Sequence, residues 1–290
     1  MKKVAIMTDT TSQMPQEIAD KYDIKVMRLY VTIEGKTYRE NEVNLPQFYQ
    51  QLIQIKEAEK LPTSSSPSVG DFLEVYRKLS QRAEAILYIG HSARLGMSPN
   101  AAREAKNIAQ EELPQTPIEV MDSGTVCGSL MLIVLEASRA AAAGKSFAEV
   151  VEVANNMRAK AKYIVLVDNL DYLTSGGRIL DGRAWSEAKV TTRALLETDT
   201  AKGVIHAPLA RYRTKTQAIE GLMEIMEGRC RGKKLHVVIT QVNAPDEAEA
   251  LKKRMSSQFQ CVELYITTTF PVVGRHTGLG SLYLCWWAED

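Results

Sequence analysis

Short apolar runs alternate with amphipathic stretches along the first 125 residues of the chain. Three runs end in polar turn formers, as expected of buried strands, and lie at residues 4–9, 85–89 and 118–122. Helices are expected from about Pro15, Pro67 and Pro99, because proline is favoured in the first turn of a helix. This βαβαβ alternation predicts a mainly parallel, Rossmann-like sheet with helices on both faces and with ligand sites at the carboxyl ends of its strands.

Residues 26–40 depart from that alternation. Polar and apolar side chains alternate from Met27 onward around Gly35, which predicts a β-hairpin inserted into the first domain. An amphipathic helix is expected over residues 45–57. Ser66 is the expected N-cap of the helix that follows it.

A pair of helices separates the two halves of the chain. The Ala-rich helix at about 126–143 ends at Gly144, and Ser146 can cap the next helix. We therefore predict an N-terminal α/β domain at residues 1–155 and a C-terminal α+β domain at residues 156–290. The second domain is expected to hold strands at 163–167, 194–199, 203–212, 235–241, 262–267 and 281–287, with helices at 214–227 and 245–256.

Composition narrows the classes of partner. Lys and Arg number 36 against 35 Asp and Glu, so no global positive charge favours nucleic acid or an anionic membrane surface. The longest apolar run falls well short of the roughly 20 residues that a membrane span needs. The N-terminus becomes polar too early for a signal peptide, so a cytoplasmic location and no membrane insertion are expected. The cysteines are isolated in sequence, which predicts small buried residues and no metal site: Cys127, Cys230, Cys261 and Cys285.

The polar run Thr63-Ser64-Ser65-Ser66 is the first candidate site. Its hydroxyls and backbone N–H groups, placed at a helix N-terminus, suit a carboxylate or phosphate. The alternative is that one serine caps the helix and that the others form a solvated loop.

A serine hydrolase is the competing class of function. Gly90-His91-Ser92 follows a strand as a nucleophile elbow does, and His276 is available downstream as a base. However, Arg94 stands where an elbow requires glycine, and the chain has no HGGG oxyanion-hole motif. Labelling of Ser92 by a fluorophosphonate probe would distinguish a hydrolase from a binding protein.

Two glycine-containing segments complete the candidates. The pair Gly176-Gly177 precedes Arg178, which can bring a guanidinium to an acidic ligand, or it can simply end a helix. Residues 274–280 form a glycine-rich stretch around His276, which is expected to be a loop that approaches a ligand closely. Neither segment matches a dinucleotide-binding or P-loop pattern, so nucleotide binding is not indicated.

Taken in order, these motifs resemble the DegV family over residues 4 to about 286. The resemblance rests on residues 9–12, 63–68, 95–98, 121–123, 170–179 and 276–280, of which Leu-x-Tyr-Leu-x-x-Gly-Gly-Arg-Ile is the most specific. It implies a two-domain DegV-like α/β fold with a ligand tunnel between the domains. It also implies that the chain binds a long-chain fatty acid such as palmitate or oleate, without a cofactor and without catalysis of its own.

The resemblance further implies a role in lipid transport or fatty acid metabolism, in which a separate fatty acid kinase subunit phosphorylates the bound carboxylate. The residues that it assigns to the head group are Thr63, Ser64, Ser65, Ser92, Gly96, Ser98, Arg178, His276 and Gly278. Gly96 stands where the family usually has a ligand-binding serine, and Leu279 replaces a proline. A third interpretation is an interaction protein that takes up lipid only incidentally.

Overall fold

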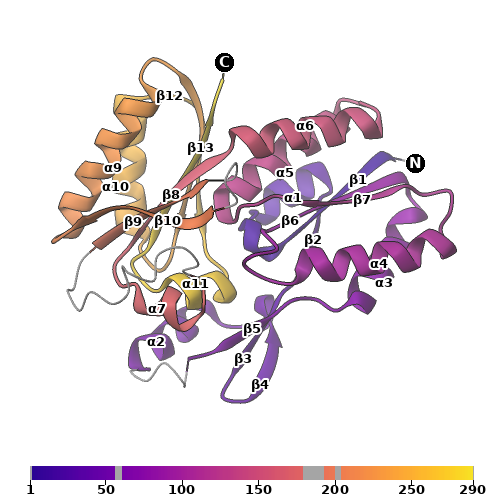
Figure 1. The fold of residues 1–290 in the computed structure, drawn as a ribbon, viewed down its shortest axis with the longest axis horizontal. Helices are drawn as coiled ribbons and strands as arrows, with labels where there is room; N and C mark the ends of the chain where they lie inside the picture. The colour runs from indigo at the N-terminus through magenta and orange to yellow at the C-terminus, as the bar shows by residue number, and fades with distance from the viewer. Residues whose placement is uncertain (1, 56–60, 179–192, 200–203, 290) are drawn as a thin grey trace.

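The computed structural model of the protein describes residues 2–55, 61–178, 193–199 and 204–289. Two lobes lie side by side, each built on its own β-sheet, and a smaller sheet closes the space below them (Figure 1). The expected α/β organisation in two domains is confirmed, whereas the position of the boundary at residue 155 stays a prediction. Two predicted positions lie outside the described residues: Ile179, the last residue of the most specific motif, and Gly203, the expected first residue of a strand.

The first lobe contains a four-stranded parallel sheet in the order β2-β1-β6-β7. Its strands are β1 (Lys2–Asp9), β2 (Lys25–Met27), β6 (Ala83–Gly90) and β7 (Ile118–Asp122). One face is covered by α3 (Val69–Ser80) and α4 (Ser98–Glu112), and the other by α1 (Gln16–Tyr22), α5 (Cys127–Ala142) and α6 (Phe147–Lys160), as Figure 1 shows. The parallel sheet follows from the helical crossovers between consecutive strands.

The second lobe contains a mixed six-stranded sheet in the order β10-β9-β8-β13-β11-β12. Its strands are β8 (Lys162–Val167), β9 (Arg193–Asp199), β10 (Val204–Tyr212), β11 (Lys234–Gln241), β12 (Gln260–Thr268) and β13 (Leu282–Ala288). Its outer helices are α9 (Lys215–Cys230) and α10 (Pro245–Gln258), which bury their apolar sides against the sheet. Each predicted strand of this domain is thus present.

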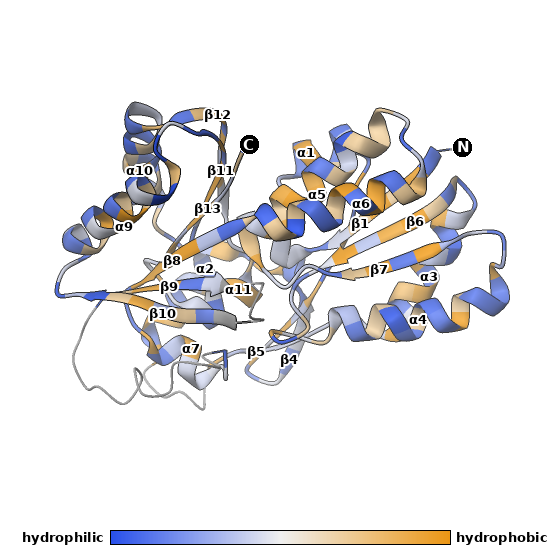
Figure 2. Cartoon of the chain, turned by 45° about the horizontal axis from the view of Figure 1, so that its top comes forward, coloured by the Kyte–Doolittle hydropathy of each residue, from blue (hydrophilic) through white to orange (hydrophobic). Residues whose placement is uncertain are grey.

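Helix α5 lies between the two lobes and packs on both sheets. Its first nine residues, 127–135, are all buried, and Figure 2 shows apolar residues along this helix and along β6 and β8. A helix that is apolar on all sides must be covered on all sides. Gly128 brings α5 against β11, because a Cβ at this position would lie 2.7 Å from Cβ of Val238.

A three-stranded antiparallel sheet, in the order β4-β3-β5, closes the space below the lobes. It consists of β3 (Tyr30–Ile33), β4 (Lys36–Arg39) and β5 (Thr63–Ser65), and α2 (Leu45–Gln54) lies between β4 and β5 in the chain. The hairpin is confirmed for β3 and β4, but its expected start at Met27 is wrong, because Met27 pairs with Asp9 in the first lobe.

The triple serine also departs from its prediction. Ser64 and Ser65 pair with β3 as a strand, and the N-cap of α3 is Ser68, whose hydroxyl accepts the N–H of Asp71. Ser66 is therefore not the cap. The serines are held by a sheet edge rather than by a helix N-terminus.

Residues 274–280 were expected to form a loop, and this expectation is wrong for residues 274–277, which are helical, but holds for residues 278–280. Helix α11 (Pro271–Thr277) includes His276 and ends at Gly278, whose φ of +80° suits glycine. The short helix α7 (Asp171–Ser175) ends at Gly176-Gly177, as the helix-ending alternative predicted. The two short helices are in contact, which brings their sequence motifs together.

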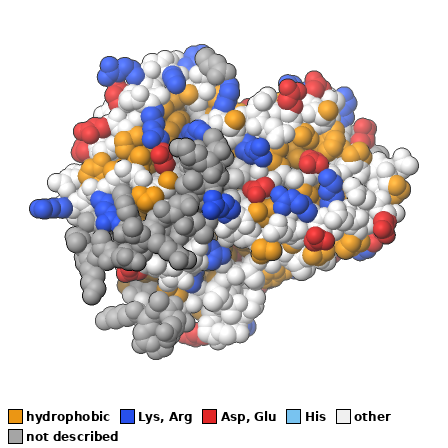
Figure 3. Space-filling model, viewed as in Figure 1, with side chains coloured by type: hydrophobic (Ala, Val, Ile, Leu, Met, Phe, Trp, Pro, Cys, Tyr) orange, Lys and Arg blue, Asp and Glu red, His pale blue; other side chains and the backbone are white. Residues whose placement is uncertain are grey.

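The balanced surface charge and the burial of three of the four cysteines agree with the expectations drawn from composition. Charges of both signs are interspersed over the face shown in Figure 3. Cys127, Cys230 and Cys285 are buried and Cys261 is half-buried, all as free thiols. Among the helices in the described parts of the chain, none has the length and apolar character required to cross a membrane.

Candidate functional site

A cavity of about 430 Å³ lies between the lobes and above the small sheet. This volume is within the range of about 300–1,000 Å³ that is usual for small-molecule sites. Its apolar walls are formed by Leu29, Leu95, Met97, Val126, Leu173, Val272, Val273 and Tyr283. Polar groups collect at Thr11, Ser64, Ser65, Ser66, His91, Arg178, His206, His276 and Thr277. The cavity therefore suits a ligand with a long apolar part and a polar end.

Ser64 and His276 meet at the polar end. Ser64 Oγ lies 2.9 Å from Nε2 of His276, and Nη1 of Arg275 lies 2.9 Å from Nδ1 of the same ring. A guanidinium can only donate, so Nδ1 accepts and the proton of the neutral ring is on Nε2. Nε2–H then donates to Ser64 Oγ, which leaves the hydroxyl proton of Ser64 available to an acceptor in the cavity.

The electrostatics of His276 keep it in this neutral form. Burial lowers the pKa of His276 well below its ordinary value, and the positive charges of Arg178 and Arg275 lower it further. The ring therefore serves as a hydrogen-bond donor that orients Ser64, not as a base that removes its proton.

Arg178 lines this end of the cavity and Arg275 lies behind His276. Carbonyl oxygens and the His276 ring accept the hydrogen bonds of the two guanidiniums. Nε and Nη2 of Arg178 donate to the carbonyl of Leu95 at 3.2 and 3.0 Å, and Arg275 donates to the carbonyl of Pro62. Within the described part of the chain, neither guanidinium is paired with a carboxylate. Burial lowers the pKa of both. A buried cation is costly without a counter-charge, so this end of the cavity favours an anion.

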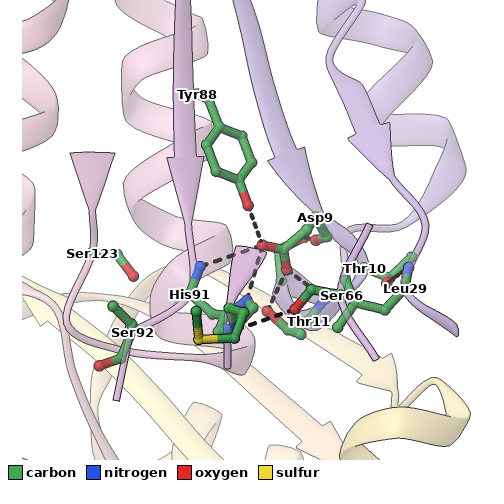
Figure 4. A network of polar contacts seen from close by, with 12 residues as sticks. Asp9, Thr10, Thr11, Leu29, Ser66, Tyr88, His91, Ser92 and Ser123 are labelled. Carbon is green, nitrogen blue, oxygen red and sulfur yellow. Dashed lines mark hydrogen bonds and ion pairs between the residues drawn. The ribbon is translucent and has the colours of Figure 1, made fainter. Parts of the chain in front are cut away.

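A second polar network adjoins the cavity and centres on Asp9 (Figure 4). Oδ1 of Asp9 accepts the N–H and hydroxyl of Thr11, and Oδ2 accepts the hydroxyl of Tyr88 at 2.7 Å and lies 3.0 Å from Nδ1 of His91. Burial alone would raise the pKa of Asp9, but His91 and these hydrogen bonds lower it to about 2. Asp9 is thus a buried, ionised carboxylate that fixes the His91 ring.

The structure brings together five of the nine predicted site residues. Ser64, Ser65, Gly96, Arg178 and His276 line the cavity. The other four, Thr63, Ser92, Ser98 and Gly278, are not part of its described wall.

The positions of these four follow from their elements. Thr63 is exposed at the start of β5, and Ser98 is buried at the start of α4. Ser92 is buried behind the cavity and accepts the N–H of Arg94, and in Figure 4 its hydroxyl points away from the Asp9 network. Gly278 packs on the ring of Tyr172.

This geometry opposes the hydrolase alternative. A triad needs His276 as the acceptor of a proton from Ser92. Both ring nitrogens of His276 are instead engaged, one by Arg275 and the other by Ser64. Ser92 therefore has no base in His276.

Five polar residues of the cavity were not predicted as site residues from the sequence: Thr11, Ser66, His91, His206 and Thr277. His91 was considered only as part of Gly90-His91-Ser92, although its place after a parallel strand was a signal for ligand contact. Nδ1 of His206 lies 3.0 Å from the carbonyl of Arg178, and burial lowers the pKa of His206 to about 4. No local sequence pattern marks His206, because only the tertiary packing of β10 brings this residue to the cavity.

One group outside the cavity has the spacing of a metal site. Atoms of Glu136, His236 and Glu263 lie within 4.8 Å of one another. However, Arg139 forms two hydrogen bonds with Glu263, at 2.9 and 2.6 Å, and neutralises it. We assign no metal to this group.

Comparisons with known proteins place this geometry in a family. The family model described as "Uncharacterised protein, DegV family" matches residues 3–289. DegV domain-containing proteins of Clostridium perfringens and Streptomyces coelicolor are 28% and 29% identical to the chain. The first alignment covers 99% of both proteins and the second covers 97% of both.

Solved structures give the same result. A DegV lipid binding protein from Thermotoga maritima is 26% identical, with a TM-score of 0.85 and 99% coverage of both chains. A second Thermotoga maritima protein, described as revealing fatty acid binding function, is 25% identical, with a TM-score of 0.85 and full coverage of both chains. A DegV family protein from Thermus thermophilus shares the fold, with a TM-score of 0.89 at 24% identity and full coverage of both chains. Since the family model matches almost the whole length, the chain belongs to the DegV family.

Proposed function

We propose that the protein binds one long-chain fatty acid, such as palmitate or oleate, with its tail in the cavity and its carboxylate at Ser64. The observation that carries this proposal is a pair of guanidiniums without a carboxylate partner in the described residues: Arg178 in the cavity wall and Arg275 directly behind His276. A fatty acid supplies both the missing negative charge and the apolar chain. The fatty acid and lipid binding described for the two Thermotoga maritima relatives supports the same ligand.

The head group is held by hydroxyls in this proposal. Ser64 accepts from His276 and donates to the carboxylate, which gives a charge-assisted hydrogen bond. Ser66 accepts the N–H of Met97 at 3.2 Å and can donate its own proton in the same way. Thr63, Ser92, Ser98 and Gly278 then act from behind the wall, by positioning the strand and loops that present these donors.

The tail contributes most of the affinity. Burying each methylene contributes about 0.8 kcal/mol, so roughly 15 methylenes contribute about 12 kcal/mol before the costs of association. The head-group bonds contribute about 1.5–3 kcal/mol and fix the orientation of the ligand.

A fatty acid kinase is the partner that we propose for this complex. The fold is shared with the Fak B3 protein of the Streptococcus pneumoniae fatty acid kinase, which was solved with linoleic acid, at 20% identity and a TM-score of 0.85. The chain has no nucleotide-binding motif, so the ATP-dependent step requires another protein. A cytoplasmic location and a role in lipid transport or fatty acid metabolism belong to this proposal.

A titration tests the ligand class. The delipidated protein is titrated with oleate and, separately, with methyl oleate, which has the same tail without the charge. We expect one oleate per chain and binding of the ester at least tenfold weaker. Equal affinity for both would contradict the role given to Arg178 and Arg275, and no binding of either would contradict the proposed function.

A further inference from the structure

The His91 ring occupies the space that a side chain at position 96 would fill. A Cβ added to Gly96 would lie 2.6 Å from Nε2 of His91, and 3.4 and 3.6 Å from the two ring carbons beside it. Nε2 is therefore the ring atom turned toward Gly96. Both residues line the cavity, so the absence of a side chain at position 96 brings an imidazole nitrogen to the cavity wall.

Asp9 determines which nitrogen of this ring carries the first proton. Nδ1 of His91 lies 3.0 Å from Oδ2 of Asp9, and the backbone N–H of His91 points to the same oxygen at 3.4 Å. An ionised carboxylate only accepts, so Nδ1 donates. Nε2 faces the cavity as an acceptor in the neutral ring and as a donor once the ring is protonated.

In their neutral forms, the two imidazoles at the cavity would have opposite tautomers. Arg275 donates to Nδ1 of His276, so the ring proton of the neutral His276 is on Nε2. Asp9 accepts from Nδ1 of His91, so in a neutral His91 ring Nε2 would carry only a lone pair. The lone pair on Nε2 of a neutral imidazole repels a carboxylate, whereas the N–H of a protonated imidazole attracts it.

We propose that His91 is an additional head-group ligand, which binds the carboxylate through a protonated Nε2 beside Gly96 and takes up one proton from solvent when the fatty acid binds. The proposal rests on the proposed function, since it names a further residue of the same site. No covalent bond changes: a carboxylate, a proton and a neutral imidazole give an imidazolium–carboxylate pair.

The groups around His91 determine the sign of this linkage. Asp9, from β1, is negative and favours the imidazolium, whereas Arg178, which lines the same cavity, is positive and opposes it. Tyr88, from β6, stays protonated because burial and Asp9 raise its pKa, and His206 and His276 stay neutral. The buried Glu40 interacts with Asp9 electrostatically, and burial raises the pKa of Glu40 to about 7. Without the ligand, the positive charge of Arg178 in the same cavity wall opposes protonation of His91. The carboxylate reduces that opposition and adds its own attraction.

Calorimetry of the full delipidated chain tests this assignment. Oleate is titrated at one pH in two buffers of different ionisation enthalpy, so that the difference in heat gives the protons taken up. We expect net uptake in the unaltered protein and none in His91→Gln, whose amide can still donate from the same place. His91→Ala and Gly96→Ala are expected to weaken oleate binding about tenfold, the first because the donor is lost and the second because a methyl group displaces the ring.

The outcomes separate the two proposals. Uptake that persists in His91→Gln, or binding by His91→Ala at full strength, overturns the role of His91 and leaves fatty acid binding intact. Failure of the unaltered protein to bind oleate overturns the proposed function instead. Thermal unfolding of each variant shows whether it is folded, and Gly96→Ala, which keeps His91, provides an independent measurement if His91→Ala does not fold.

Discussion

Ser64 and His276 are 212 residues apart in the chain, yet Ser64 Oγ lies 2.9 Å from Nε2 of His276. The bond joins the edge of the small sheet to α11 of the second lobe. Because Arg275 fixes the proton of His276 on Nε2, the serine hydroxyl is directed to donate into the cavity. This one contact links the fold to the selection of an acidic ligand.

Replacing Ser64 with alanine removes that donor. We expect Ser64→Ala to weaken oleate binding about tenfold, as for the loss of a charge-assisted hydrogen bond, with the fold unchanged. Competition with a fluorescent fatty acid measures the effect. Ser257→Ala on the exposed side of α10 is the control and should bind as the unaltered protein does. Equal losses in the two variants would show that Ser64 has no specific role.

Arg178 supplies charge and also ties the loop at Leu95 to α7. We expect Arg178→Met to weaken oleate binding at least tenfold, and methyl oleate binding much less, because only the acid interacts with the charge. Titration of both ligands into the variant measures the difference. A parallel loss for acid and ester would mean that Arg178 acts only by shaping the cavity.

The buried carboxyl of Glu40 should make the stability of the protein depend on pH. Burial raises its pKa to about 7 from the ordinary 4.5, although hydrogen bonds from Thr10 and from the N–H of Val272 lower it in part. A carboxyl whose pKa is raised by folding stabilises the protein below pH 4.5, and that contribution is lost as the pH rises through about 7. A shift of this size corresponds to about 3 kcal/mol.

We therefore expect Glu40→Gln to flatten the fall in unfolding free energy between pH 5 and pH 8, roughly the window of that shift. Urea denaturation of the delipidated protein at several pH values measures it. Exposed Glu34 offers a matched change, and Glu34→Gln should leave the profile as it is. An unchanged profile in Glu40→Gln would contradict the buried, proton-binding role.

Alanine substitutions at two helical glycines should change the stability in opposite directions. A Cβ at Gly128 would lie 2.7 Å from Cβ of Val238, whereas a Cβ at Gly228, in α9, meets nothing within 4 Å. Gly128→Ala should lower the unfolding free energy by about 1–3 kcal/mol through overpacking. Gly228→Ala should raise it by about 0.5–1 kcal/mol, because alanine is the better helix former. Denaturant midpoints of the two variants measure these changes. Destabilisation by both substitutions would indicate that packing on β11 is not the cause of the effect at Gly128.

The strands and long helices could be predicted because each carries its own pattern. Residues 4–9 and 118–122 are apolar runs of strand length, and the helix at 147–160 has its capping serine at Ser146. Proline and glycine marked most of the ends. The local pattern of apolar and polar residues was enough to predict an element when its burial depends on its own residues.

The small sheet and α11 could not be predicted in that way. Residues 63–65 are polar and form a strand only because β3 pairs with them. Helix α11 has seven residues, includes Gly274, and is stabilised by its contacts with neighbouring elements. Ser64 and His276 were chosen from motifs, but their contact depends on residues 212 apart. His91 and His206 reach the cavity through the packing of the lobes, which no local spacing reveals.

Native mass spectrometry of the purified protein shows whether the cavity selects a fatty acid by its charged end. We expect that the delipidated chain, after incubation with an equimolar mixture of oleate and methyl oleate, carries one oleate and that denaturation releases it unchanged. Chains that stay empty, or that carry the ester as readily as the acid, would contradict this expectation.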